Sequence, residues 1–175
     1  MNYFEFFGLP VSFFPDQAAL RRAFLLNSKK YHPDFHTLAD EGRQAEMLEQ
    51  STLNNQAYHT LSNPDLLVRY VLEIKGLLGE EGNQPALPQD FLMEVMDINE
   101  GLMELEMDFD PARFADTNSA VDRLEQSLNE AVKPVLDAYT DPEGDPSLSK
   151  VADYFFKKRY LLRIRENLSK FAAAF

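Results

Sequence analysis

Apolar side chains near the start of the chain recur on one face of a predicted helix over residues 16–32. The apolar members of this face are Leu20, Phe24 and Tyr31. Asn27 lies on the same face, so we expect its side chain to be hydrogen-bonded or partly exposed. Asp16 is a favourable N-cap, and Pro33 ends the helix because the residue before a proline avoids the α-helical conformation.

A second helical pattern follows at Met47, Ser51, Asn54, Tyr58 and Leu61, and predicts a helix over residues 43–61. The tripeptide Ser-Asn-Pro then interrupts the pattern, and a shorter helix follows that ends at Gly76. The first block therefore predicts an antiparallel helical hairpin with short flanking helices.

The hydrophobic pattern continues after a glycine- and proline-rich stretch. Residues 76–89 hold three glycines and two prolines and predict a hinge. Three longer helices are predicted beyond it, over residues 88–107, 111–139 and 146–173. Three antiparallel helices with short loops form a bundle. No stretch alternates as a β-strand does, so we expect an all-α protein with domains at residues 1–75 and 90–175.

The first helix of this bundle is apolar on two sides. Its core seam comprises Phe91, Val95, Ile98, Leu102, Leu105 and Phe109. Its opposite side carries Leu92, Met93, Met96, Met103 and Met107, with Asp97, Glu100 and Glu104 among or beside them. Either another helix covers this second side, or it is a docking surface with adaptable methionines and orienting carboxylates. The carboxylates favour docking, and we expect the basic residues of the last helix to balance the acidic helix.

Composition narrows the function classes. The net charge of −12 argues against nucleic acid as a partner, but leaves room for a local basic patch that docks on an acidic protein. The chain has no cysteine, which excludes disulfides and cysteine-ligated metal centres. Because no apolar run reaches the length of a membrane span and no leader pattern follows Met1, we expect a soluble, cytoplasmic protein without membrane contact.

The run Lys-Lys-Tyr-His-Pro-Asp-Phe-His-Thr, residues 29–37, concentrates the candidate chemistry. His32, Asp34 and His36 are close enough in sequence to bind a metal, with His59 or Asp40 as a further ligand. Their spacing around Pro33 does not match the usual metal signatures, however, and no nucleophile or glycine-rich loop stands nearby for acid–base chemistry. For His36 we expect a solvent-exposed loop side chain.

A recognition role fits the same run better. Arg22 and Lys29 share one face of the preceding helix, flanked by Arg21 and Lys30. A turn fixed by proline at the end of this basic face presents an imidazole and a carboxylate to an acidic protein surface. We therefore expect a docking site without bound metal or cofactor.

These features together resemble a J-domain, the DnaJ-type module. The resemblance rests on a basic helix ending in Tyr-His-Pro-Asp, a short loop, a helix carrying Asn-Gln-Ala-Tyr-His-Thr-Leu-Ser-Asn-Pro, and the opening Tyr-Phe-Glu-Phe-Phe-Gly-Leu-Pro. It covers about residues 1–75. The acidic, methionine-rich helix and the remaining helices are similar to HscB, the co-chaperone of iron–sulfur cluster assembly.

The resemblance implies a non-enzymatic co-chaperone that stimulates the ATPase of a DnaK-type chaperone (HscA) and delivers the scaffold protein IscU to it. The implied chaperone-binding residues are His32, Pro33, Asp34, Arg21, Arg22, Lys29 and Lys30. The implied scaffold-binding residues are Leu92, Met93, Met96, Asp97, Glu100, Glu104 and Tyr160. Leu25 and Leu26 stand where many J-domains carry basic or polar residues, so the positive charge of the implied docking surface is lower here.

Two other functions stay open at this stage. One is a J-domain co-chaperone with a different client protein. The other is a small helical metalloenzyme that uses His32, Asp34 and His36.

Overall fold

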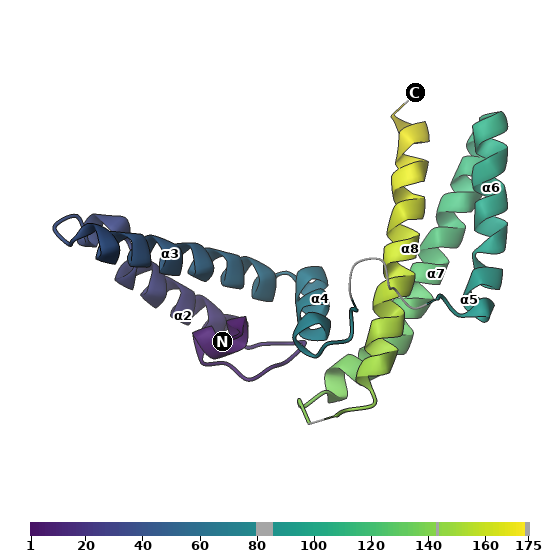
Figure 1. Ribbon diagram of the computed structural model, residues 1–175. Helices are drawn as coiled ribbons and strands as arrows, with labels where there is room; N and C mark the ends of the chain where they lie inside the picture. The colour runs from purple at the N-terminus through teal and green to yellow at the C-terminus, as the bar shows by residue number, and fades with distance from the viewer. Residues whose placement is uncertain (80–85, 143, 174–175) are drawn as a thin grey trace. The chain divides into compact units, whose positions relative to one another are not determined.

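The computed structural model describes residues 1–79, 86–142 and 144–173, and within them the regular structure is helical (Figure 1). The helices are α1 (Tyr3–Phe7), α2 (Gln17–Lys30), the 3-10 turn η1 (Pro33–Phe35), α3 (Glu41–Ser62), α4 (Pro64–Ile74), α5 (Gln89–Glu94), α6 (Met96–Met107), α7 (Pro111–Ala138) and α8 (Leu148–Ala172). Two compact units result: Met1–Gly76 with Tyr139–Asp145, and Leu77–Ala138 with Pro146–Phe175. Residues 80–85 of the predicted hinge lie outside the described residues, and the domain limits stay predictions.

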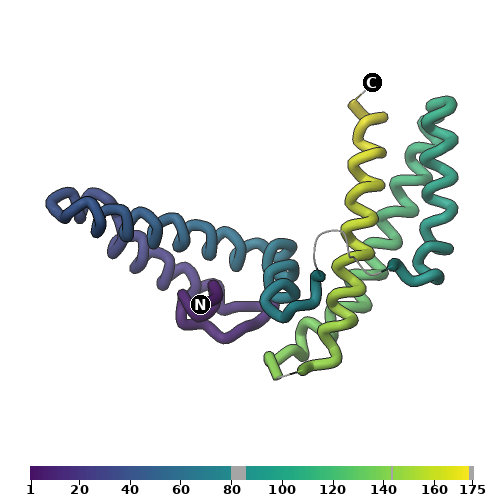
Figure 2. Tube along the Cα trace, in the orientation of Figure 1, coloured from purple at the N-terminus to yellow at the C-terminus, as the bar shows by residue number. Residues whose placement is uncertain are grey.

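The N-terminal unit is built on the predicted hairpin, in which α2 and α3 lie side by side (Figure 2). Asp16 caps α2, because its carboxylate accepts hydrogen bonds from the backbone amides of Ala18 and Ala19 at 2.9 and 3.0 Å. The bonds from Ala19 and Ala18 lower the pKa of Asp16. The helix ends at Lys30, as the proline signal predicts.

A buried amide joins the two helices of the hairpin. The side chain of Asn54 on α3 donates to the Phe24 carbonyl at 3.2 Å and to the Ser28 hydroxyl at 3.0 Å. Beside it the ring of Phe24 stacks on Tyr58, with centroids 4.2 Å apart. Asn27 is half-buried, which confirms the expectation that its polar side chain keeps access to water.

The loop between α7 and α8 groups with the N-terminal unit. The ring of Tyr139 packs against Phe13 at 4.9 Å, and its hydroxyl donates to Asp141 at 2.8 Å. Lys75 completes the cluster, with its ammonium 2.5 Å from the same carboxylate. Burial and the bond to Asp141 raise the pKa of Tyr139. Burial alone would raise the pKa of Asp141, but the bonds from Lys75 and Tyr139 lower it below its ordinary value.

The C-terminal unit is a bundle of α6, α7 and α8, preceded by the short α5. Its buried core comprises Phe91, Val95, Ile98, Leu102, Leu105, Val121, Leu124, Leu161, Ile164 and Leu168. The expectation of one helix over residues 88–107 is wrong, because a turn at Val95 divides it into α5 and α6. The Val95 amide is shared between the carbonyls of Phe91 and Met93, which tightens the last turn of α5. Phe91 and Ile98 are both buried, so the core seam continues across the break.

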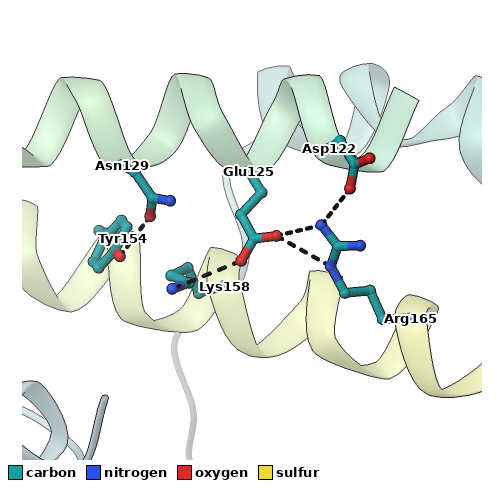
Figure 3. A network of polar contacts seen from close by, with 6 residues as sticks. All are labelled: Asp122, Glu125, Asn129, Tyr154, Lys158 and Arg165. Carbon is teal, nitrogen blue, oxygen red and sulfur yellow. Dashed lines mark hydrogen bonds and ion pairs between the residues drawn. The ribbon is translucent and has the colours of Figure 1, made fainter. Parts of the chain in front are cut away.

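Ionic contacts join α7 to α8 along the bundle (Figure 3). Arg165 on α8 donates to Asp122 at 2.8 Å and forms a two-point contact with Glu125. The ammonium of Lys158 lies 3.7 Å from the other oxygen of Glu125. These basic residues therefore balance carboxylates of α7 rather than those of the methionine-rich helix, which corrects the expected pairing.

Gly101 sets the approach of α6 to α7, and we predict that Gly101→Ala destabilises the bundle. A Cβ at this position would lie 2.5 Å from the Thr117 hydroxyl, which is itself bonded to the Arg113 carbonyl at 2.8 Å. Overpacking of this kind costs about 1–3 kcal/mol and exceeds the roughly 1 kcal/mol gain in helix propensity. Thermal unfolding should show a lower Tm for Gly101→Ala and recovery in the double variant Gly101→Ala/Thr117→Ala. A Tm at or above wild type in the single variant would contradict this packing argument.

Candidate protein-docking sites

The tripeptide His32-Pro33-Asp34 forms an exposed turn directly after α2. Pro33 begins η1, and the Nδ1 atom of His32 accepts a hydrogen bond from the Asp34 amide at 3.2 Å. The same nitrogen lies 3.7 Å from the Asp34 carboxylate, and the two side chains are 51% and 84% exposed. Because Nδ1 accepts, the neutral imidazole carries its proton on Nε2. The turn thus presents an N–H donor and an anionic acceptor to solvent.

His36 fixes this turn to the end of α2. Its Nε2 atom is 2.8 Å from the Lys30 carbonyl oxygen, and since a carbonyl only accepts, Nε2 must carry the hydrogen. The bond satisfies one of the carbonyls that a helix leaves unpaired at its C-terminus. His36 does lie in a loop, as expected, but the residue is only partly exposed and its ring has a structural partner.

The geometry does not support metal binding at the turn. The Nδ1 atom of His32 is directed to a backbone amide, and the Nε2 atom of His36 to a backbone carbonyl. Throughout the part of the chain that the structure describes, no three His, Asp or Glu side chains are grouped so as to hold a metal ion. In the same residues, no helix is long and apolar enough to cross a membrane.

A basic surface leads to the turn. Arg21, Arg22, Lys29 and Lys30 are all exposed on α2. The helix contains no acidic residue, so every charged side chain on its exposed face is cationic, in a chain of net charge −12. Lys29 precedes His32 by only three positions, which places the cationic face and the turn on one continuous surface.

A shallow pocket of about 310 Å³ lies beside the turn and was not expected from the sequence. Its lining residues are Pro33, Asp34, His36, Thr37, Gln44, Ala45, Met47 and Leu48. It forms because the turn folds over the first turns of α3. The only sequence signal was Leu48, an apolar residue outside the helical pattern, and its side chain is 60% exposed.

The second candidate site is the methionine face of α5 and α6, defined here as Leu92, Met93, Met96, Asp97, Glu100, Met103, Glu104 and Met107. Met93 and Met96 are 68% and 64% exposed, and Leu92 is 44% exposed. Asp97, Glu100 and Glu104 are exposed as well. The bundle packs on the opposite seam, so the hypothesis that another helix covers this face is wrong for the described residues. A row of exposed thioethers among carboxylates is typical of a protein-docking surface.

Two residues near this face have partners inside the bundle. The Glu104 carboxylate lies 2.6 Å from Nε of Arg113 on α7, a charge contact without the alignment of a good hydrogen bond. Tyr160 on α8 is partly buried, and its hydroxyl accepts from the Asn99 amide at 2.9 Å while its ring packs edge-on against Phe91 at 5.9 Å. Tyr160 therefore supports the helix that carries the methionine face.

Comparison with known proteins finds similarity to HscB co-chaperones. A family model described as the HSCB C-terminal oligomerisation domain matches residues 87–169. Proteins described as co-chaperone protein HscB homolog, from two Vibrio cholerae serotype O1 strains, are 35% identical over 111 residues. The chain is therefore similar to HscB proteins over these residues. The match spans 63% of this chain and 65% of the relative, just under two thirds of the relative's length.

Solved HscB structures share the fold. A chaperone HscB from Vibrio cholerae superposes with a TM-score of 0.68 at 24% identity, covering 99% of each chain. A human co-chaperone protein HscB gives a TM-score of 0.73 at 24% identity, covering 100% of this chain and 84% of the human chain. The predicted all-α fold, with an N-terminal J-domain and a C-terminal three-helix bundle, is confirmed.

We predict that the hydrogen bond of His36 orders the His32-Pro33-Asp34 turn. His36→Leu removes the donor and leaves the Lys30 carbonyl unpaired, whereas His36→Gln keeps an N–H at a similar reach. Amide hydrogen exchange followed by NMR should show exchange about two- to tenfold faster for residues 31–37 in His36→Leu, since a hydrogen bond contributes about 0.5–1.5 kcal/mol. Exchange in His36→Gln should stay close to wild type. Equal protection in all three proteins would show that the bond does not hold the turn.

Proposed function

We propose that this chain is a co-chaperone that stimulates ATP hydrolysis by a DnaK-type chaperone, HscA, and presents the iron–sulfur scaffold protein IscU to it. The observation that carries the proposal is the exposed His32-Pro33-Asp34 turn, held at the end of a helix whose charged side chains are all cationic. The relatives named co-chaperone support it. In this proposal the chain performs no chemistry, because hydrolysis takes place on the chaperone.

The proposed chaperone-binding surface combines long-range electrostatic attraction of the partner with oriented hydrogen bonds at contact. Arg21, Arg22, Lys29 and Lys30 attract an acidic surface of the ATPase domain and raise the rate of encounter. At contact, the Asp34 carboxylate accepts from a cationic or amide group of the partner, and His32 donates from Nε2. Pro33 restricts the backbone so that the two side chains keep their relative geometry.

The scaffold-binding side lies on the methionine face. Leu92, Met93 and Met96 supply a deformable apolar contact, and the unbranched thioethers adapt to the partner surface. Asp97, Glu100 and Glu104 surround this contact with negative charge, which favours a scaffold surface rich in basic residues. Tyr160 belongs to this proposed site through its support of Phe91 and Asn99.

The two activities are assigned to separate domains. In this proposal residues 1–75 stimulate the chaperone, residues 90–175 hold the scaffold, and residues 76–89 link the two. The turn and the methionine face lie in different compact units, which supports independent binding of the two partners.

Asp34→Ala should abolish stimulation of the HscA ATPase, because it removes the anionic acceptor at the tip of the turn. Steady-state hydrolysis measured over a range of co-chaperone concentrations should fall to the basal rate, while IscU binding measured by calorimetry stays unchanged. Glu49→Ala, which removes another exposed carboxylate from the same unit, serves as the control and should stimulate normally. Full stimulation by Asp34→Ala would refute the assignment.

Met93→Ala/Met96→Ala should weaken IscU binding by about tenfold or more, the usual effect of truncating central apolar contacts. ATPase stimulation in the absence of IscU should not change. Leu162→Ala removes an exposed leucine from α8 and is the matched control. If the double variant bound IscU with wild-type affinity, the methionine face would not be the scaffold-binding site; if wild type itself did not bind IscU while still stimulating the chaperone, the client would be a different protein.

A further inference from the structure

Two large apolar side chains lie in water on the cationic face of α2. Leu25 is 55% exposed and Leu26 is 70% exposed. Positions 22, 25, 26 and 29 fall on one face of a helix, so Arg22 and Lys29 bracket the two leucines along the helix axis. The opposite face carries Leu20 and packs against α1 and α3. The exposed leucines therefore contribute little to the core of the hairpin.

We propose that Arg22, Leu25, Leu26 and Lys29 form one mixed docking surface whose occupant is an apolar patch, rimmed by carboxylates, on the ATPase domain of the chaperone. This inference rests on the proposed function and adds Leu25 and Leu26 to it as residues that select the chaperone partner. The cations would attract the acidic rim, and burial of the leucines would slow dissociation once the partner is seated. The surface continues into the turn, because His32 follows Lys29 by three positions.

The charge and extent of this surface favour an acidic protein surface over a second copy of the chain or a membrane. A second copy of the same surface would bring Arg22 and Lys29 against the same two cations, which is unfavourable. A membrane surface also attracts basic helices, but binding there needs a long apolar face, and the broad apolar face of α2 is already packed on α3. An acidic protein surface with a small apolar centre matches both the charge and the extent of the exposed face.

The test compares wild type with Leu25→Gln/Leu26→Gln, because glutamine has nearly the helix propensity of leucine. The half-saturating co-chaperone concentration for HscA ATPase stimulation should rise about tenfold, whereas the maximal stimulation should stay unchanged because the turn is intact. Leu162→Gln on α8 should leave both parameters at wild type. Circular dichroism should show the same helix content in all three proteins.

Three results would overturn the inference. The first is an unchanged half-saturating concentration in a double variant that stimulates normally. The second is a lowered maximum, which would place the defect in the turn. The third is sedimentation of wild type, but not of the double variant, with vesicles of anionic phosphatidylglycerol. That result would show that Leu25 and Leu26 bind membranes. Absence of stimulation by wild type itself would instead refute the proposed function, and this inference with it.

Discussion

Each helix of this protein buries one stripe of side chains, and the small number of helices leaves the opposite stripe in water. This constraint follows from the size of the units, because a hairpin and a three-helix bundle cannot surround any of their members. In α2 the buried stripe holds Leu20, while in α6 it holds Ile98 and Leu105. The outer stripes are thereby free to carry residues for contact with other proteins, and they hold the methionine face and the basic surface that leads to the His32-Pro33-Asp34 turn.

The two outer stripes carry opposite charge. The exposed face of α2 is cationic, whereas Asp97, Glu100 and Glu104 make the methionine face acidic. Partners that suit one surface are repelled by the other, so the two proposed binding events cannot exchange sites. The carboxylate of Glu125 on α7 is paired with Arg165 and Lys158 on α8. Because it is neutralised within the bundle, it does not add to the negative charge of the methionine face.

The helices and the hairpin could be predicted from the sequence, because helical spacing, the Asp16 cap and the Pro33 stop are local signals. The His32-Pro33-Asp34 tripeptide and the basic helix before it are also local in sequence, so they could be recognised without the structure. Features that depend on residues far apart in the sequence could not be predicted. The break at Val95, the ionic contacts of Arg165 with α7 and the packing of Tyr139 on Phe13 are set by tertiary structure, which no local pattern encodes. Whether the methionine face is covered was likewise undecided until the bundle showed which side α7 and α8 occupy.

The hydrogen bonds around the tripeptide have a consequence for the entropy of association. His36 holds the turn to the Lys30 carbonyl, the His36 amide bonds the Pro33 carbonyl at 2.9 Å, and Pro33 restricts its own φ angle. Ordering a flexible backbone residue costs about 1–2 kcal/mol, and here that ordering is completed during folding. In the proposed function, a partner that docks on the turn therefore meets a backbone that is already ordered, and more of the contact energy remains available for affinity.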